Sequence, residues 1–404
     1  MSATIYSERH IGVLIGRFQP FHLGHMHQIS EALDQGLNNF KIFIGSANSG
    51  RTLQNPFTVA ERVQMIGLAV GDMLIDKGCA TVKSEAYSQS VTDQQAYPIW
   101  TITGAKSSRE QVTIEIYPLN DYLYNDDKWK LEFLTALFTE RSGFKFRPIH
   151  TLLGYHKDAT SWYLDEFREL EQAIVKTPYK AVIGGTETMI SATDIRERYF
   201  LDETISMTDS YKENGWDTIL PYKVALWLEL FKVQQPRDWQ YVRDEYKFMV
   251  DYKKLWAGSP YPPIFVTTDA LIQQGNNILM IQRRTQPGKN MWAMPGGFLK
   301  DNELLETGML RELREETGLR VSMPVLKRCI VNREVIDNPN RSSRGRTITH
   351  VFHIKLEDIS NGLPAIRGAS DAVKARWIPL YEVAKMKAEI FEDHWDIIAK
   401  LIKF

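Results

Sequence analysis

The amino-acid sequence predicts two α/β domains joined in one chain. Its 404 residues exceed the usual size of a single domain. Near the N-terminus, a short β-branched run at residues 11–15, a helical stretch at 23–37 and an apolar run at 40–45 follow in the order of a βαβ unit. After the proline- and glycine-rich cluster at residues 258–263, the pattern changes to paired strands and a long helix.

The first domain is expected to contain an open parallel sheet covered by helices, because strand and helix patterns alternate along it. Residues 76–111 form a long polar segment that contains Tyr97, Trp100 and Gly104. We interpret this segment as a surface excursion, with a lid or an oligomer contact as the alternatives. Further strands are predicted at residues 112–117, 149–154 and 181–184, and further helices at 58–70, 126–140 and 222–232.

A linker with some helix is predicted at residues 234–256, which are charged and aromatic. The second domain is expected to be a mixed α/β domain with helices at residues 303–317 and 381–403. We place the first domain at 1–233, the linker at 234–260 and the second domain at 261–404. Strands of the second domain are predicted at residues 264–271, 277–282, 325–331, 347–356 and 375–378.

The composition narrows the class of protein. A formal net charge of −1 gives no support for a nucleic-acid partner or a membrane surface. The two cysteines, Cys79 and Cys329, are far apart and make neither a disulfide framework nor a zinc cluster. The polar N-terminus lacks the apolar region of a signal peptide, and no apolar run reaches the length of a membrane span. We therefore expect a cytoplasmic, globular protein.

The first chemical motif stands where the first strand ends and the first helix begins. Open α/β sheets bind ligands at this edge, and a helix N-terminus offers free N–H groups and partial positive charge to a phosphate. Gly24 lets the backbone approach such a ligand, and His22 and His25 can donate hydrogen bonds to phosphoryl oxygens. Two surface histidines at a helix start are the alternative. The motif is Gly16-Arg17-Phe18-Gln19-Pro20-Phe21-His22-Leu23-Gly24-His25.

A second motif, residues 190–196, is typical of the start of a helix. Ser191 or Thr193 can cap its N-terminus, and Arg196 then lies in the first turn, near the phosphate-favouring end of the helix. Together, the two motifs resemble the nucleotidyltransferase superfamily with the signatures His-x-Gly-His and Ile-Ser-x-Thr-x-x-Arg. The resemblance implies a Rossmann-like parallel-sheet domain.

The resemblance narrows to the archaeal-type nicotinamide mononucleotide (NMN) adenylyltransferases at residues 55–62, 118–129 and 154–164. The third segment departs from the family pattern, because Tyr155 stands where the family often has histidine. That departure leaves the role of this position in doubt.

The resemblance also implies roles for individual residues. His22 and His25 would contact the phosphates of ATP and Arg196 would hold the outer ones, so these are the expected catalytic residues. Asn125 and Trp129 would hold the nicotinamide, since an electron-poor pyridinium ring stacks well on an indole. For Trp129, a place in the hydrophobic core is the alternative. The other expected substrate-binding residues are Gly16, Arg17, Phe18, Gln19, Arg62, Ser191 and Thr193.

The most specific motif of the chain is Gly297-x5-Glu303-x7-Arg311-Glu312-Leu313-Arg314-Glu315-Glu316-Thr317-Gly318-Leu319. Its spacing puts the carboxylates of Glu312, Glu315 and Glu316 on one helix face. These carboxylates repel one another unless a hard divalent cation, Mg²⁺ or Mn²⁺, lies between them. Such a cation can neutralise a pyrophosphate and activate a water molecule.

This motif resembles the Nudix box at every defined position, which implies an α/β/α-sandwich Nudix domain that hydrolyses a pyrophosphate bond. Glu315 or Glu316 would then be the general base or the anchor of the metal-bound water, and Glu312 a further metal ligand. Residues 337–346 and 391–394 are similar to features of ADP-ribose pyrophosphatases, with a flexible basic loop and a plain helix as the alternative. The structural positions of the box are Gly297, Glu303, Arg311 and Gly318. Arg311 can pair with Glu303 and fix the helix against the preceding loop, and Gly318 can end the helix in a left-handed cap.

The whole arrangement resembles the fused NMN adenylyltransferase/Nudix proteins. The implied reactions are ATP + NMN → NAD + pyrophosphate in the first domain and hydrolysis of ADP-ribose to AMP and ribose 5-phosphate in the second. The expected partners are therefore ATP, NMN, NAD and ADP-ribose. For the first domain, the alternative is a different phosphate acceptor such as phosphopantetheine. For the second domain, the alternatives are another nucleoside diphosphate as the substrate or a role as an ADP-ribose sensor. The sequence does not decide the preference between nicotinamide and nicotinate, the formation of a homo-oligomer or the coupling between the two sites.

Overall fold

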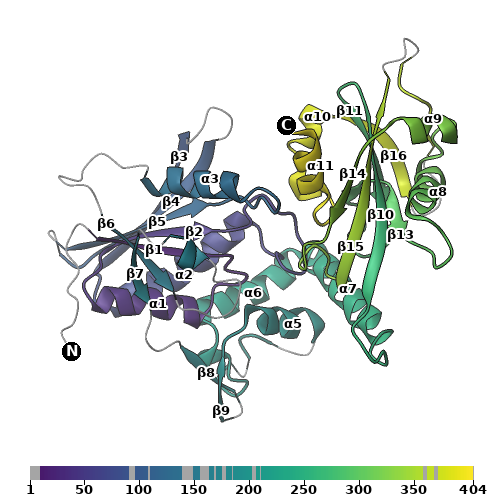
Figure 1. Cartoon of the computed structure of the whole chain (residues 1–404). Helices are drawn as coiled ribbons and strands as arrows, with labels where there is room; N and C mark the ends of the chain where they lie inside the picture. The colour runs from purple at the N-terminus through teal and green to yellow at the C-terminus, as the bar shows by residue number, and fades with distance from the viewer. Residues whose placement is uncertain are drawn as a thin grey trace. The chain divides into compact units, whose positions relative to one another are not determined.

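The chain forms two compact units in this computed structural model (Figure 1). The first unit comprises residues 1–121 and 127–242, and the second comprises residues 122–126 and 243–404. The domain boundaries placed at residues 233 and 261 remain a prediction. The structure describes residues 10–90, 96–107, 110–138, 149–154, 163–167, 170–174, 179–183, 185–202, 206–209, 211–357, 362–367 and 372–403.

A seven-stranded sheet forms the centre of the first unit, in the order β3-β4-β5-β2-β1-β6-β7. Within this order, β5, β2, β1, β6 and β7 run parallel to one another, which confirms the predicted parallel α/β sheet. Strands β3 and β4 add an antiparallel pair beside β5. The strands are β1 (His10–Gly16), β2 (Asn39–Ile44), β3 (Thr81–Ser90), β4 (Ala96–Ala105), β5 (Gln111–Pro118), β6 (Ile149–Gly154) and β7 (Glu171–Ile174).

The interpretation of residues 76–111 as a surface excursion is wrong, because β3 and β4 belong to the central sheet. Ile99 and Ile102 of β4 are buried, and Trp100 pairs with Ile116 of β5. An antiparallel edge needs an apolar face on one side only, so its strands can be rich in polar residues. The polar composition of the segment therefore conceals two strands.

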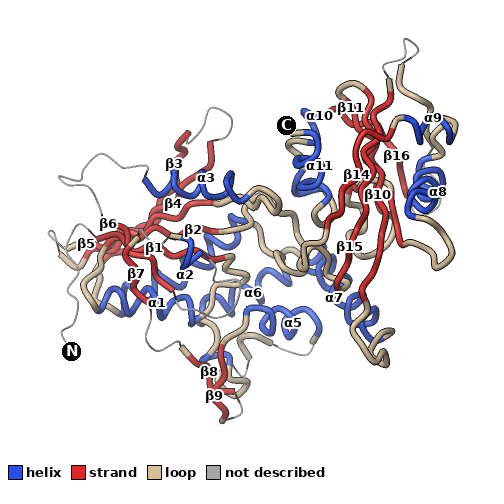
Figure 2. The backbone as a smooth tube through the Cα atoms, in the orientation of Figure 1, coloured by secondary structure: helices blue, strands red, loops and turns tan. Residues whose placement is uncertain are grey.

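Helices cover both faces of this sheet (Figure 2). On one face, Phe133 of α3 packs with Val13 and Phe43, and the Lys41 ammonium donates to the carbonyl of Leu137 at 2.7 Å. On the opposite face, a Cβ added at Gly104 would lie 3.1 Å from Leu74 of α2. The helices are α1 (Leu23–Asp34), α2 (Val59–Asp76) and α3 (Asp126–Phe138).

The remainder of the first unit follows the sheet in the sequence. Strand β8, predicted at residues 181–184, pairs with β9 in a separate two-stranded sheet, and residue 184 lies outside the described residues. The predicted linker at residues 234–256 is largely one helix, α7 (Pro236–Lys254). The other elements are α4 (Tyr163–Glu166), β8 (Lys180–Ile183), β9 (Thr186–Met189), α5 (Ala192–Leu201), the 3₁₀ helix η2 (Trp216–Thr218) and α6 (Tyr222–Gln234).

The second unit contains a mixed sheet in the order β12-β11-β10-β15-β14, with β13 paired to β10 and β16 to β11. Strands β10 and β15 run parallel along eleven-residue segments, and the other strand pairs are antiparallel. The strands are β10 (Ile264–Gln274), β11 (Asn277–Arg283), β12 (Trp292–Ala293), β13 (Gly296–Phe298), β14 (Ile330–Ile336), β15 (Arg346–Leu356) and β16 (Ala372–Pro379).

Two helical layers enclose this sheet, which confirms the predicted α/β/α sandwich (Figure 2). Leu313 of α8 packs with Ile272 on one face, and Trp395 of α11 packs with Leu271 on the other. Ile272 and Leu271 are neighbours on one strand, so their side chains point to opposite faces. The helices are α8 (Leu305–Thr317), α9 (Met323–Arg328), α10 (Leu380–Val383), the 3₁₀ helix η3 (Lys387–Glu389) and α11 (His394–Ile402). Within the described residues, no helix is both long and apolar enough to cross a membrane.

Two predictions for the second unit are wrong in part. Residues 325–328 lie in α9 rather than in a strand, because Pro324 near the helix start favours a first turn there. The single helix predicted at residues 381–403 is divided into α10, η3 and α11. Between them the Phe391 amide donates to the carbonyl of Trp292 at 2.8 Å, so this stretch pairs with the edge of the sheet.

A buried ion pair joins two loops of the second unit. The Arg341 guanidinium donates two hydrogen bonds of 2.9 Å to the carboxylate of Asp393, and both side chains are 2% exposed. The Tyr124 hydroxyl donates to the same carboxylate at 2.6 Å. Losing the carboxylate would leave a buried cation without its anion, which is far more costly than losing an exposed pair.

We predict that Asp393→Ala lowers the free energy of unfolding of the second unit by about 3–5 kcal/mol. The measurement is urea unfolding followed by tryptophan fluorescence. Asp251→Ala is the matched control, because the Asp251–Lys254 pair is exposed and should contribute at most about 1 kcal/mol. Equal losses in the two variants would contradict a special role for the buried pair.

Candidate active sites

Two histidines lie at the carboxyl end of β1, where α1 begins. The rings of His22 and His25 stack with their centroids 3.6 Å apart, and the His22 amide donates to Nδ1 of His25 at 3.2 Å. A Cβ added at Gly24 would lie 3.1 Å from the His22 ring, so glycine keeps room beside it. The structure therefore places the predicted histidines together at a helix N-terminus, the position that favours phosphate.

The loop before these histidines is held by a buried glutamine. The Gln19 side chain accepts a hydrogen bond from the Phe57 amide at 3.0 Å and donates to the Phe57 carbonyl at 2.9 Å. Phe18 is buried with a φ of 52°, and its ring lies 2.9 Å from a Cβ added at Gly16. Gln19 and Phe18 are predicted substrate-binding residues, and in this structure their side chains shape the loop.

Arg62 and Arg196 are almost fully buried, at 1% and 4% exposure. The Arg62 guanidinium donates to the carbonyls of Arg17 at 2.9 Å and Gly45 at 2.6 Å. Arg196 donates to the carbonyl of Gln19 at 2.8 Å and to that of Leu53 at 3.0 Å. Both arginines thus fix the loops that follow the sheet strands. Their direct contact with phosphate remains a prediction.

The remaining predicted residues of this site are placed separately. Ser191 caps α5, since its hydroxyl accepts a hydrogen bond from the Asp194 amide at 3.3 Å. The Thr193 hydroxyl accepts from Arg196 at 3.2 Å, and Arg17 is exposed at the loop surface. Of the third predicted segment, residues 155–162, with Tyr155, lie outside the described residues.

Asn125 and Trp129 lie near the start of α3. Asn125 is exposed, and its amide donates to the Tyr122 carbonyl at 3.0 Å. The Trp129 ring stacks on Phe133 with centroids 5.7 Å apart and packs against the core of the first unit. Trp129 therefore has the core contacts given above as the alternative, while one side of it is only partly covered.

The sequence analysis missed a polar cluster at the ends of β2 and β5. Ser46, which has a φ of 53°, donates its hydroxyl hydrogen to the carboxylate of Asp121. Asn48 accepts from the Asp121 amide at 3.0 Å and donates to its carbonyl at 3.2 Å. The signal was available, because each residue lies in the loop that follows a parallel strand, at the ligand-binding edge.

In the second unit, Arg311 organises the carboxylates of α8. It donates to Glu303 from Nε at 3.0 Å and from a terminal nitrogen at 2.6 Å, and it also donates to Glu312 at 2.7 Å and Glu315 at 3.2 Å. The two hydrogen bonds from Arg311 hold the pKa of Glu303 at about 2. The predicted Arg311–Glu303 pair is therefore present, and Glu303 stays ionised near neutral pH.

The three carboxylates of α8 differ in their surroundings. Glu315 is 48% exposed, whereas Glu316 is 6% exposed and accepts a hydrogen bond from the Gly296 amide at 2.9 Å. Burial raises the pKa of Glu316 to about 8, and the neighbouring Glu312 adds repulsion. Burial also raises the pKa of Glu312, although Arg311 opposes the shift. Glu316 is buried and Glu312 is half-buried close to it, so both charged forms are disfavoured, and a cation between them would stabilise the ionised carboxylates.

Three glycines shape the ends of this site. A Cβ added at Gly297 would lie 2.6 Å from the Glu312 carboxylate, and one added at Gly296 would overlap the Thr268 carbonyl. Gly318 ends α8 with a φ of 54°, the left-handed cap predicted for it. Glycine is thus required for close approach at two positions and for backbone conformation at the third.

The donor chemistry of α8 fits a hard divalent cation. Glu312, Glu315 and Glu316 supply carboxylate oxygens from one helix face, the ligands that Mg²⁺ and Mn²⁺ prefer. In their present positions, no three His, Cys, Asp or Glu side chains among the described residues are arranged to hold a metal ion. Arg311 donates to one oxygen of Glu312 and to one of Glu315, so a cation held there would share these two carboxylates with the arginine.

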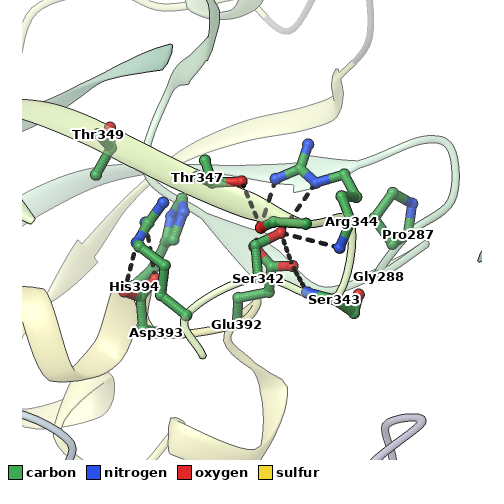
Figure 3. A network of polar contacts seen from close by, with 12 residues as sticks. Pro287, Gly288, Ser342, Ser343, Arg344, Thr347, Thr349, Glu392, Asp393 and His394 are labelled. Carbon is green, nitrogen blue, oxygen red and sulfur yellow. Dashed lines mark hydrogen bonds and ion pairs between the residues drawn. The ribbon is translucent and has the colours of Figure 1, made fainter. Parts of the chain in front are cut away.

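The two predicted specificity segments, residues 337–346 and 391–394, come together in the second unit (Figure 3). Glu392 accepts from the Ser342 hydroxyl at 2.8 Å and from Arg344 at 3.4 Å. The sequence analysis missed Arg283, whose guanidinium lies 4.1 Å from the centroid of the Phe391 ring. Its only sequence signal is its position at the end of a strand.

Comparison with known proteins finds relatives of both parts of the chain. The cytidylyltransferase-like family matches residues 13–133, and the NUDIX domain family matches residues 264–401. A crystal structure of a bifunctional NMN adenylyltransferase/ADP-ribose pyrophosphatase from Francisella tularensis is 31% identical, with a TM-score of 0.76, over 98% of this chain and 99% of that one. A second structure from that organism, complexed with AMP and a manganese ion, is 29% identical, with a TM-score of 0.74 over the same 98% and 99%.

Single-domain relatives match each half. An ADP-ribose pyrophosphatase of Methanocaldococcus jannaschii is 32% identical over 34% of this chain and 73% of that protein. A nicotinamide-nucleotide adenylyltransferase of Saccharolobus solfataricus is 30% identical over 32% of this chain and 72% of that protein. Fold and sites thus define a nucleotidyltransferase joined to a Nudix domain. The chain belongs to the family of bifunctional NMN adenylyltransferase/ADP-ribose pyrophosphatases.

We predict that Gly297→Ala lowers ADP-ribose hydrolysis by roughly 10- to 100-fold, because its methyl group would displace the Glu312 carboxylate. The displaced atoms are the end of a flexible side chain, so stability should change little. The measurement is kcat/KM with thermal unfolding alongside. Gly258→Ala serves as the control, since its Cβ would meet nothing within 4 Å. Unchanged hydrolysis in Gly297→Ala would contradict the close packing described above.

We further predict a pH-dependent stability that depends on Glu316. Its pKa of about 8 in the folded chain lies above the usual 4.5, so the folded state binds the proton more tightly. This side chain therefore lowers the free energy of unfolding as pH rises from about 4.5 to about 8, by a few kcal/mol in total. The measurement is the free energy of unfolding as a function of pH in EDTA. Glu316→Gln should not show this decrease in the free energy of unfolding, whereas Glu315→Gln, at an exposed position, should still show it. Parallel pH profiles for wild type and Glu316→Gln would disprove the shift.

Proposed function

We propose that the first unit transfers the adenylyl group of ATP to NMN and so makes NAD and pyrophosphate. The stacked pair His22/His25 at the start of α1 carries this proposal. A phosphate oxygen of NMN attacks the α-phosphorus of ATP, and the bond to pyrophosphate breaks. No nucleophile of the enzyme is required, so catalysis consists of positioning and of stabilising charge.

Each group near His22 has a part in this reaction. His22 and His25 donate hydrogen bonds to phosphoryl oxygens as negative charge develops on them. Arg196 acts electrostatically on Arg17, so two cationic groups lie near the same loop. We propose that Arg17 and Arg196 attract the outer phosphates, while Arg62 keeps the two strand-end loops in place. Asn125 and Trp129 are proposed to hold the nicotinamide ring.

We propose that the second unit hydrolyses ADP-ribose to AMP and ribose 5-phosphate. The observation that carries this proposal is the intact set Glu312, Glu315 and Glu316 on one face of α8, next to the specificity segments. A Mg²⁺ ion, for which Mn²⁺ can substitute, would be held by these carboxylates and would supply charge neutralisation and an activated water. Glu316 then accepts a proton from the attacking water, since its carboxylate would lie beside the bound cation.

The proposal also covers the adenylyl donor, the cofactor and the compartment in which the chain acts. We propose that the chain binds ATP as the adenylyl donor, uses Mg²⁺ as its cofactor and acts in the cytoplasm. One chain would then synthesise NAD and also remove ADP-ribose, a reactive breakdown product of NAD.

An HPLC assay with ATP, NMN and Mg²⁺, and separately with ADP-ribose and Mg²⁺, tests both activities on the full chain. We predict that His22→Ala lowers NAD formation by roughly 100-fold or more and leaves ADP-ribose hydrolysis unchanged. Glu316→Gln should do the reverse, because it removes the proposed base and a metal ligand without affecting the first unit. Each variant is thus the other's control for folding.

The outcomes separate the alternatives. A wild-type chain that forms no NAD but adenylylates another phosphate, such as phosphopantetheine, would overturn the assignment of NMN. A chain that binds ADP-ribose in calorimetry without cleaving it would be a sensor rather than a hydrolase. Loss of both activities in His22→Ala would contradict two independent sites.

A further inference from the structure

Arg283, at the end of β11, is fixed in position without the use of its outer nitrogens. Its Nε donates to the Pro287 carbonyl at 2.8 Å, and its guanidinium lies on the Phe391 ring, 4.1 Å from the centroid. Within the described part of the chain, neither terminal amino group of this guanidinium has a hydrogen-bond partner. The side chain is half-buried. Arg283 therefore keeps four N–H donors available at a fixed place.

The surroundings of Arg283 are themselves rigid. The Gly288 amide donates to the buried carboxylate of Glu245 at 3.0 Å, which fixes the turn that contains Pro287. A Cβ added at Gly288 would overlap the Phe391 ring, so this turn and the ring are in direct contact. Glu245 thus acts as a positioning residue for the turn. A guanidinium held in this way loses little entropy when it binds an anion.

A second guanidinium lies beside the first. Arg344 lies 5.8 Å from the centroid of the same Phe391 ring and 5.2 Å from that of Phe298. It donates to Ser342 at 3.2 Å and only weakly, at 3.4 Å, to Glu392. Burial lowers the pKa of Arg283, and repulsion from Arg344 lowers it further. Two adjacent cations at one ring are costly unless an anion offsets them.

The pair lies beside the Nudix carboxylates. Glu316 and Asp269 both act electrostatically on Arg283, and Phe298, under Arg344, directly follows Gly297 of the box. A substrate with two linked phosphates needs both to be neutralised. A cation on the carboxylates of α8 can neutralise one of these phosphates. The other phosphate then needs hydrogen-bond donors of its own.

We infer that Arg283, with Arg344 beside it, binds the second phosphate of a nucleoside diphosphate ester, the one that the carboxylates of α8 do not serve. The inference rests on the proposed hydrolysis by the second unit and names the residue that recognises the diphosphate. The fork of a guanidinium matches two phosphate oxygens, which the point charge of lysine does not. A role confined to packing on Phe391 would not need free terminal nitrogens.

The test compares Arg283→Met, Arg283→Lys and, as the matched control, Arg284→Met, because Arg284 is the exposed neighbour on the same strand end. In the full chain with Mg²⁺, Arg283→Met should raise the KM for ADP-ribose by roughly 10- to 100-fold, with a smaller change in kcat. Arg283→Lys should recover part of the loss. Arg284→Met should change KM less than about twofold, and NAD formation by the first unit should be unchanged in all three.

Product inhibition distinguishes recognition of one phosphate from a merely structural role. AMP and ribose 5-phosphate each carry one of the two phosphates of ADP-ribose. If Arg283 binds one phosphate, Arg283→Met should weaken inhibition by one product by about tenfold and leave the other as in wild type. Equal weakening of both, or an unchanged KM for ADP-ribose, overturns the inference while the proposed function stands.

Failure of the proposed function gives a different result. If the wild-type chain does not cleave ADP-ribose, calorimetric binding of ADP-ribose with Mg²⁺ decides the role of Arg283 instead. Binding that Arg283→Met weakens about tenfold supports the inference for a sensor as for an enzyme. Absent binding, or binding that the variant leaves unchanged, overturns it.

Discussion

Buried guanidinium groups are the constraint on which the rest of this structure depends. A guanidinium that leaves water needs acceptors for its donors, and for Arg62 and Arg196 most of these acceptors are main-chain carbonyls. The carbonyls belong to loops that follow parallel strands, so each arginine fixes the spacing between loops far apart in the sequence. In Arg341 the acceptor is the carboxylate of Asp393. Because an unpaired buried cation is so costly, these loops have few alternative arrangements.

The proposed reactions would use opposite charges to handle phosphate in the two units. In the first unit, a helix N-terminus and histidines are proposed to meet the phosphates directly, so the protein itself would supply the positive character. In the second unit, the three carboxylates of α8 are proposed to act on one phosphate through a cation. This difference fits the chemistry proposed for each. Transfer between two phosphates needs no activated water, whereas hydrolysis needs one.

Local motifs were predictable from the sequence because their geometry is set within one or two turns of chain. The Glu303–Arg311 pair and the Gly318 cap follow from helical spacing, and the His22/His25 pair follows from a strand-to-helix junction. Arg283 on Phe391 and Glu245 at Gly288 were not predictable, since each joins residues that only the tertiary fold brings together. The same holds for β3 and β4, whose polar sequence shows little of an edge strand. Tertiary packing decided these elements where local pattern was weak.

The carboxylates around the Nudix helix differ in how they bond to Arg311. Glu303 has two strong hydrogen bonds to Arg311 and a low pKa, so it stays with the arginine and holds the loop before α8. Glu312 and Glu315 each accept one hydrogen bond from the same guanidinium and keep a second oxygen for another partner. Among the described residues Glu316 has no bond to Arg311 and is buried against Gly296 instead. It is the carboxylate whose charge the protein leaves least compensated. If Glu316 holds the proposed cation, a proton competes with that cation for it, and because metal ligands must be deprotonated, metal binding would become more favourable as pH rises.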